Sequence, residues 1–401
     1  MASSVVTPEM RAAAKRPHAF RSIYGLTLIF ALHWALVAYV NSALLSQFVS
    51  DRTIGVLYIL SSILTIVAFF STRRILGRWG NSRTALGLGV TETIVLVGLA
   101  FANSPYVSLP LFVLHHALVP LLLFNIDIFM EDRIGKSEKI TGGTRGIMLG
   151  ILSIGTAFAT LAVGFLLGSG EPRFMLAYVA SAILMVVFCF LLLRYFGTFR
   201  DPVYASLNIF DIWYRFSIKH DLRSVFVCHF LLQLFFAWMV IYVPLYLASA
   251  IGFSWDEIGL VLFAGLFAYV ILEYPIGVVA DRWIGEKEMM TAGFIILAVS
   301  TAYMAFLKVP ILLPWMVTMF MTRVGASFVE VTTESYFFKQ TKDADAGIIG
   351  FFRACRPIAF LLASLLGSVL LIYTPFAYLF AIFGLLMLPG AVFSLLLKDT
   401  R

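Results

Sequence analysis

The chain has 401 residues, of which 61% are hydrophobic and 13% charged, and its formal net charge is +7. Soluble proteins contain about 25% charged residues, so this composition excludes a water-soluble domain and indicates that the bilayer is the solvent. The three cysteines lie in apolar segments and have the spacing of neither a disulfide framework nor a zinc site. Six scattered histidines do not supply the clustered ligands of a membrane metalloenzyme. We therefore expect no metal, no cofactor and no enzymatic activity.

Apolar segments long enough to cross a membrane follow one another along the chain. We expect twelve spans, at 20–46, 53–71, 84–102, 107–129, 143–168, 173–196, 222–249, 256–280, 289–307, 311–335, 346–372 and 375–397. The first 20 residues are polar and basic, so the first span is expected to act as the membrane signal without a cleaved leader. The predicted fold class is an all-α membrane protein with 12 transmembrane helices.

The basic residues are distributed unevenly between alternate loops. One set of loops and tails holds 23 Lys and Arg residues, whereas the other set holds only Arg52, Arg173 and Lys308. Positive charge accumulates on the cytoplasmic side, so this bias predicts a multi-pass protein of the inner or plasma membrane with both termini in the cytoplasm. The basic charge then reflects topology and contact with anionic lipids, and no nucleic-acid partner is expected.

The two halves of the chain share short motifs at similar spacing, which indicates a duplicated membrane unit. Tyr39-Val40, Ile54-Gly55 and Arg78-Trp79-Gly80 recur as Tyr242-Val243, Ile258-Gly259 and Arg282-Trp283-Ile284-Gly285. A long loop near the middle contains an amphipathic stretch at 209–216 that is expected to lie on the membrane surface. The expected domains are a cytoplasmic tail at 1–19, six-helix bundles at 20–196 and 222–397, a cytoplasmic central loop at 197–221, and a tail at 398–401.

The segment from Pro275 to Lys287, which contains the run Asp281-Arg282, resembles a loop motif of the major facilitator superfamily, G-x-x-x-D-R-x-G-[RK]-[RK], with one extra residue before the second glycine. The resemblance implies two pseudo-symmetric six-helix bundles that rock around a central site. It also implies that span 8 packs against span 5 and span 2 against span 11. The residues of the implied cytoplasmic gate are Gly277, Asp281, Arg282, Gly285, Lys287 and Arg145.

In this gate, Asp281 is expected to cap the positive N-terminus of span 5 and to pair with Arg145, which would favour the outward-open state. The alternative is that Asp281 is only a solvated loop charge. The counterpart loop between spans 2 and 3 has Gly77 in the place of the aspartate. The gate is therefore expected to depend mainly on the second half.

Ionisable side chains at membrane depth cost roughly 2.5–3.5 kcal/mol each and are usually functional or paired. The candidates for proton coupling or ion pairing are Asp127, Glu131, Glu330, Glu334, Arg353 and Arg356. One interpretation is a structural ion-pair cluster that joins spans 10 and 11. The other is a proton relay in which Glu330 or Asp127 titrates as the halves move. Glu92, in span 3, is expected to be buried with a structural role.

Further polar and aromatic residues are candidates for the wall of the central cavity. The substrate-binding candidates are His33, Asn41, His116, Asn125, Gln233, Trp238, Glu273 and Arg323. Arg323 favours an anionic substrate, or pairs with Glu273 or Glu330; Glu273 favours a cation or a proton. The adjacent His115 and His116 point about 100° apart on a helix, so only one of them can face the centre.

The resulting functional hypothesis is a monomeric secondary active transporter of a small solute that works by alternating access and is coupled to protons. Its expected partners are a small-molecule substrate, protons and membrane lipids. The alternatives are a drug or metabolite efflux antiporter, a flippase for lipid-like substrates, and a non-transporting sensor. Span 5 lacks the Gly-Pro pair of the family's antiporter motif, which argues against drug/proton antiport.

Overall fold

The computed structural model describes residues 8–134, 138–201, 214, 218, 220–280, 284–340 and 346–398. These residues form helices, and no strand occurs among them. The N-terminal half contains α1 (Pro8–Ala38), α2 (Asn41–Ser46), α3 (Asp51–Trp79), α4 (Asn81–Phe101), α5 (Pro105–Ile134), α6 (Glu138–Leu167) and α7 (Phe174–Phe196). The C-terminal half contains α9 (His220–Tyr246), η1 (Leu247–Ile251), α10 (Trp255–Val279), α11 (Glu286–Tyr303), η3 (Met304–Phe306), α12 (Leu312–Gln340), α13 (Ala346–Tyr373) and α14 (Tyr378–Leu395).

Twelve of the described segments are long and apolar enough to cross a membrane, which confirms the predicted fold class. The first expected span, 20–46, coincides with Phe20–Ser46, and 173–196 differs by one residue from Phe174–Phe196. The expected span 346–372 differs by one residue from α13. Long apolar runs bounded by turn residues are therefore sufficient to locate these helices.

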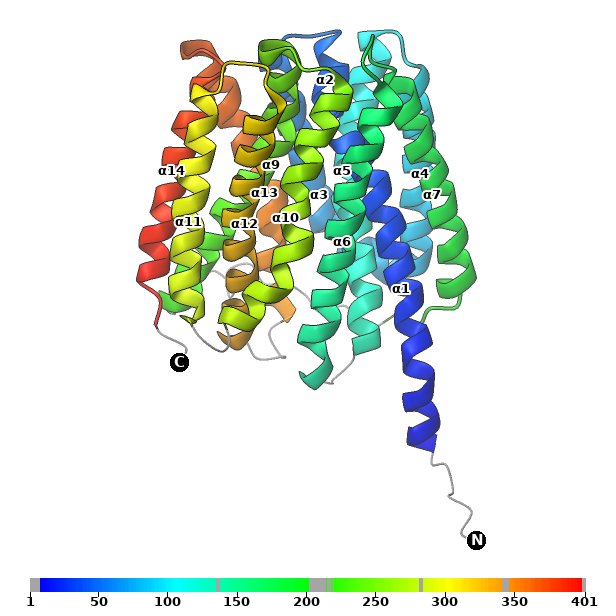
Figure 1. Ribbon diagram of the computed structural model, residues 1–401. Coiled ribbons are helices and arrows are strands. Elements are labelled where there is room, and N and C mark those ends of the chain that lie inside the picture. Colours follow the sequence, from blue (N-terminus) through cyan, green and yellow to red (C-terminus); the bar gives the residue numbers. More distant parts are fainter. Residues whose placement is uncertain are drawn as a thin grey trace.

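The helices stand side by side as two bundles (Figure 1), and both chain ends lie on one side of the molecule, here called the terminal side. The opposite, distal side carries α2. Between the bundles, α6 packs along α10 and α3 packs along α13, as the family resemblance implies for spans 5 and 8 and for spans 2 and 11. We propose that the boundary between the bundles lies within 197–221, most of which is outside the described residues.

The two halves meet at the distal side through very small residues. A Cβ added to Gly259 of α10 would lie 2.8 Å from Gly164 Cα and 2.9 Å from the carbonyl oxygen of Thr160, both in α6. Gly55 of α3 approaches Ser364 and Ser368 of α13 in the same way. Lipid provides no hydrophobic driving force between helices, so close backbone approach of this kind is what holds membrane helices together. The distal glycine seam, formed by these two crossings, therefore closes the molecule on that side.

The first span is not one continuous helix. The α-helical pattern stops at Ala38, turns through Tyr39 and Val40, and resumes at Asn41. At the break, the Val40 N–H donates to the carbonyl of Val37 at 3.0 Å, which is a tighter turn than in an α-helix. Tyr242, the counterpart of Tyr39 in the second half, lies inside the uninterrupted part of α9. The duplication predicted from the motifs is therefore asymmetric at this position.

The shared glycines at the loops before α4 and α11 have the same role in both halves. Gly80 and Gly285 have φ angles of 79° and 99°, in the region that favours glycine, and each precedes a helix. In the first half, the Asn81 N–H donates to Asp201 Oδ1 at 2.6 Å, so an acidic side chain from beyond α7 binds the positive N-terminus of α4.

This contact leads to a stability prediction. Asp201→Ala should lower the free energy of unfolding by about 0.5–2 kcal/mol because the N-terminal amide of α4 loses its acceptor. The measurement is the thermal unfolding midpoint of the purified protein in detergent. Glu171→Ala, at an exposed loop position, is the matched control and should leave the midpoint unchanged. An equal loss in both variants would contradict the assignment.

Candidate functional site

Arg323 of α12 is a buried cation in the middle of the molecule, with 2% of its surface exposed. Its guanidinium carbon lies 5.0 Å from the ring centre of Phe235, and Nη1 donates to Thr322 Oγ1 at 3.4 Å. Arg323 also interacts electrostatically with the phenol of Tyr39, across the interface between the halves. Among the residues that the structure describes, no carboxylate lies within ion-pair distance of Arg323 in this conformation.

A second arginine of the C-terminal half also reaches the first span. The guanidinium carbon of Arg356 in α13 lies 5.0 Å from the ring centre of Trp34 in α1. A cation over an indole ring is attracted by about 0.5–2 kcal/mol, more when water is excluded. Arg356 interacts electrostatically with Tyr39 as well. Two cations of one half thus lie against the aromatic side chains Trp34 and Tyr39 of the other.

Three further groups border the same interface. Ser153 Oγ of α6 donates to Glu273 Oε1 of α10 at 3.0 Å. The ring centre of His116 in α5 lies 5.1 Å from that of Phe360 in α13. The hydroxyl group of Tyr269 in α10 is buried and has no hydrogen-bond partner among the described residues. The interface therefore combines two cations, one carboxylate, aromatic rings and an unsatisfied hydroxyl group.

A separate polar cluster lies inside the N-terminal bundle. Glu92 of α4 has no exposed surface, and its Oε1 lies 2.5 Å from Nδ1 of His115 and 3.6 Å from Nε2 of His33. Asn41 Nδ2 is 3.3 Å from His115 Nε2, and the Tyr178 hydroxyl donates to Asn41 Oδ1 at 2.6 Å. His33 and Asn41, two of the candidates for the cavity wall, contact this cluster, and their role in substrate binding stays a prediction. We refer to His33, Glu92 and His115 as the histidine–glutamate cluster.

Three other candidates for the cavity wall are held within one half. Trp238 is fully buried and stacks on Phe383, with ring centres 4.2 Å apart. Asn125 donates to the carbonyl of Leu121 at 2.6 Å, one turn earlier in α5. Gln233 lies in α9 with 9% of its surface exposed. These placements favour packing roles for Trp238 and Asn125.

The acidic pairs at the terminal side are described only in part. Asp127, Glu330 and Glu334 are half-buried, and Glu330 interacts electrostatically with Tyr269. The side chains of Glu131 and Arg353 lie outside the described residues, so the expected ion-pair cluster and the expected relay both stay predictions.

The gate motif is also described in part. Asp281 and Arg282 lie outside the described residues, as does the side chain of Arg145. Gly277 lies next to Val331 of α12, and Gly285 supplies the turn before α11. Lys287 is half-buried in the first turn of that helix. The capping role of Asp281 stays a prediction.

Sequence reasoning missed several residues of these two sites. Trp34 is an ordinary residue for an apolar span, and no sequence signal separates it from the other aromatic side chains. Tyr39 belongs to the repeated Tyr-Val motif, but that motif gave no indication of a contact with Arg323. Glu92 carried a signal, because a carboxylate in mid-span is rare. Its partner His115 did not, because helix rotation decides which of two adjacent histidines points inward. The structure turns His115 towards Glu92 and His116 towards the other half.

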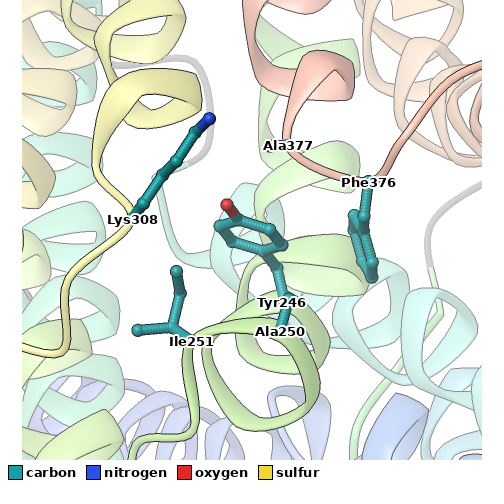
Figure 2. A pocket seen from close by; sticks show the side chains of 6 residues that line it. All are labelled: Tyr246, Ala250, Ile251, Lys308, Phe376 and Ala377. Carbon is teal, nitrogen blue, oxygen red and sulfur yellow. The ribbon is translucent and has the colours of Figure 1, made fainter.

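A hollow of about 290 Å³ lies at the distal end of the C-terminal half (Figure 2). It is lined by Tyr246, Ala250, Ile251, Lys308, Phe376 and Ala377. Figure 2 shows the Tyr246 ring between the side chains of Lys308 and Phe376. All of its lining residues belong to one half, so this hollow is distinct from the interface that carries Arg323 and Glu273.

Comparisons with known proteins show which family and which solved structures this chain resembles. Residues 225–401 match the model of the family described as Major Facilitator Superfamily. No curated protein matches the chain. A crystal structure of the nucleoside transporter NupG superposes with a TM-score of 0.70 and 14% identity, covering 93% of this chain and 97% of that one. A point mutant of NupG gives a TM-score of 0.71 at the same identity, covering 93% of this chain and 99% of that one.

At this identity the likeness to NupG concerns the fold. Together with the family match over the C-terminal half, the fold indicates a multi-pass membrane transporter that binds a small-molecule substrate, not an enzyme. The match over residues 225–401 and the shared fold bear out the resemblance of this chain to the major facilitator superfamily.

Proposed function

We propose that the protein carries a small organic anion by alternating access and that protons are the coupling ion. The observation that carries this proposal is Arg323, a buried guanidinium group at the interface between the halves with no carboxylate partner among the described residues. A buried charge is strongly unfavourable unless it is paired. An anion bound at Arg323 would supply the missing partner, which favours anionic over cationic substrates.

The neighbours of Arg323 support an amphipathic anion. Phe235 and Tyr39, beside Arg323, and Trp34, beside Arg356, offer aromatic surface for an apolar part of the substrate. The buried Tyr269 hydroxyl can donate a hydrogen bond to a second oxygen of the anion. Glu273 is a further acidic group on the same interface, and in its ionised form it repels a second negative charge. A monoanion with an apolar or aromatic portion fits this set of groups best.

The orientation follows from charge. We propose that the terminal side is cytoplasmic, since 23 of the 29 basic residues lie in the tails and loops of that side. The distal glycine seam is then closed towards the outside, and the substrate site is reached from the cytoplasm. We also propose that the protein acts as a monomer in the inner or plasma membrane, with its basic loops against anionic lipids.

Efflux of amphipathic compounds is the second candidate, because the interface is rich in aromatic rings. A flippase or sensor role has no comparable support from Arg323. Import and efflux of an anion use the same binding groups, so the substrate class can be tested before the direction of transport.

The test is a thermal-shift screen of the purified protein at about pH 6 and about pH 8, since a ligand that binds the folded state stabilises it by mass action. The panel contains benzoate, inorganic phosphate, a quaternary ammonium ion, a sugar, a fatty acid and, because NupG is a nucleoside transporter, a nucleoside. Stabilisation by benzoate, without a shift from the ammonium ion, is the expected result. Stabilisation only by the cation or by the nucleoside would refute the proposal.

A further inference from the structure

The hydrogen bonds of the histidine–glutamate cluster determine where its protons lie. His115 Nδ1 lies 2.5 Å from Glu92 Oε1; in the tautomer that satisfies this contact with an ionised Glu92, which only accepts, the hydrogen of His115 is on Nδ1. His115 Nε2 is then an acceptor, and Asn41 Nδ2 donates to it at 3.3 Å. Tyr178 donates in turn to Asn41 Oδ1. This side of the cluster is fully satisfied by a neutral His115.

On the His33 side of the cluster, two buried acceptor atoms lack a hydrogen-bond donor within the described part of the chain. Ser181 Oγ donates to the backbone carbonyl of His33 at 2.9 Å, so the same oxygen accepts from His33 Nδ1 at 2.7 Å. In a neutral His33 the Nε2 atom then has only a lone pair, and it lies 3.6 Å from Glu92 Oε1. His33 Nε2 and Glu92 Oε2 are both buried without a hydrogen-bond partner among the described residues. Each unsatisfied buried acceptor is unfavourable, and a proton added to His33 Nε2 would turn that atom into a donor beside the Glu92 carboxylate.

The cluster adjoins the anion site through the first span. His33 is followed by Trp34, whose ring lies under the guanidinium group of Arg356. Adjacent side chains on a helix point about 100° apart, so His33 and Trp34 point in different directions from the first span. Asn41, which bonds to His115, lies directly after the break at Tyr39 and Val40. Tyr39 interacts with Arg323. The first span therefore separates the cluster from the anion site and contacts both.

We propose that the histidine–glutamate cluster is the coupling proton site of this transporter, with the proton held between His33 Nε2 and Glu92. This inference rests on the proposed anion transport. A proton from solution forms one new N–H bond on His33 and no other bond changes. Protonation raises the net charge of the cluster from −1 to 0. Binding of a monoanion at Arg323 adds a charge of −1 at the neighbouring site. Proton and anion together leave the charge of the carrier unchanged, which favours their movement as a pair across a medium of low dielectric constant.

The other ionisable groups around the cluster are few. His115 and His116 lie on α5, Tyr58 on α3 and Tyr178 on α7, and Arg356 acts on His116 from the other half. His116 Nδ1 lies 2.9 Å from Ser61 Oγ, so its ring is held apart from Glu92. The two tyrosines are hydrogen-bonded, Tyr178 to Asn41 and Tyr58 to Ser42. His33 Nε2 and Glu92 Oε2 are thus the atoms of the cluster that can gain a proton without losing an existing bond.

The experiment has two readouts. The first is nitrogen NMR of the detergent-solubilised protein with labelled histidine, titrated with acid in the absence of any anion. The His33 signal should change from the Nδ1–H tautomer to the doubly protonated ring, while His115 keeps its tautomer. Glu92→Gln should abolish this change, because the amide offers no negative charge to the imidazolium. Should Glu92→Gln fail to fold, His33→Gln serves instead and should remove the titrating signal.

The second readout is the affinity for benzoate. In the wild-type protein the apparent Kd should fall by about tenfold for each pH unit of acidification above the titration point, because binding of proton and anion is reciprocal. Glu92→Gln should bind benzoate with an affinity that does not depend on pH. The matched controls are Asp127→Asn and Glu330→Gln, which remove carboxylates of the terminal side. Both variants should keep the wild-type pH dependence of benzoate binding.

The outcomes separate the two proposals. Titration of His33 without benzoate binding at either pH supports the proton site and refutes the anion proposal. Benzoate binding whose pH dependence is the same in wild type and Glu92→Gln overturns the cluster as the coupling site. Loss of the pH dependence in Glu330→Gln or Asp127→Asn, with Glu92→Gln unaffected, would assign coupling to the terminal-side carboxylates instead.

Discussion

Arg323→Met is expected to make the ligand-free protein more stable and to abolish anion binding. The wild-type guanidinium is 2% exposed and has no carboxylate partner among the described residues. An arginine at the centre of a membrane helix is unfavourable by about 2.5–3.5 kcal/mol, so a methionine of similar length should stabilise the protein by on the order of 1–3 kcal/mol. Loss of the guanidinium group that would pair with a bound anion should weaken binding by about 2–5 kcal/mol, or roughly 30-fold to several thousandfold.

The measurement is the thermal unfolding midpoint with and without benzoate, together with uptake into proteoliposomes. Arg194→Met is the matched control, because Arg194 also lies over an aromatic ring, that of Tyr195, but is exposed. The control should change neither binding nor transport. A lower midpoint for Arg323→Met with binding retained would show that Arg323 is a structural residue, and the anion proposal would then fail.

Gly259→Val is expected to prevent closure at the distal side and to reduce transport by about tenfold or more, since closure of one side is a step of the transport cycle. Even a single methyl group at this position would lie 2.8 Å from Gly164 Cα and 2.9 Å from Thr160 O, which are backbone atoms that cannot turn aside. The two bundles must therefore separate. The protein should accumulate in a conformation that is open on the distal side.

Accessibility of an introduced cysteine to a membrane-impermeant reagent measures this shift. A Ser364→Cys reporter, at the other glycine crossing, should react faster when Gly259 is valine. Gly87→Val is the control, because Gly87 lies on an exposed face of α4 with no atom of another residue within 4 Å of its added Cβ. Equal reporter reactivity in both variants would mean that the seam does not gate the distal side.

The helices could be predicted from sequence because membrane spans depend on local composition alone. Phe20–Ser46 was located to the residue by its apolar run and flanking polar segments. The break inside it was not, because Tyr39 and Val40 include neither proline nor glycine, which usually mark such interruptions. At the break, Tyr39 and Asn41 contact side chains of other helices, which a local sequence pattern does not reveal.

The candidate site could be predicted only where a single residue was unusual by itself. Arg323 and Glu273 stand out because charges in an apolar span are rare. The grouping of His33, Glu92 and His115 could not be predicted, since it depends on how three helices distant in sequence are rotated about their axes. Trp238 was a candidate for the cavity wall by its position, and its stacking on Phe383 within its own bundle could not be predicted either.

The distal glycine seam also has a thermodynamic consequence. A contact made by glycine backbones and two serines buries little side-chain surface, so the free-energy difference between the closed and separated arrangements should be small. When two conformations are nearly equally populated, a ligand that prefers one of them about tenfold is enough to make that state dominant. A wide hydrophobic seam would require a far larger preference. Gly55, Gly164 and Gly259 thus allow a weakly bound solute to control which conformation the population adopts.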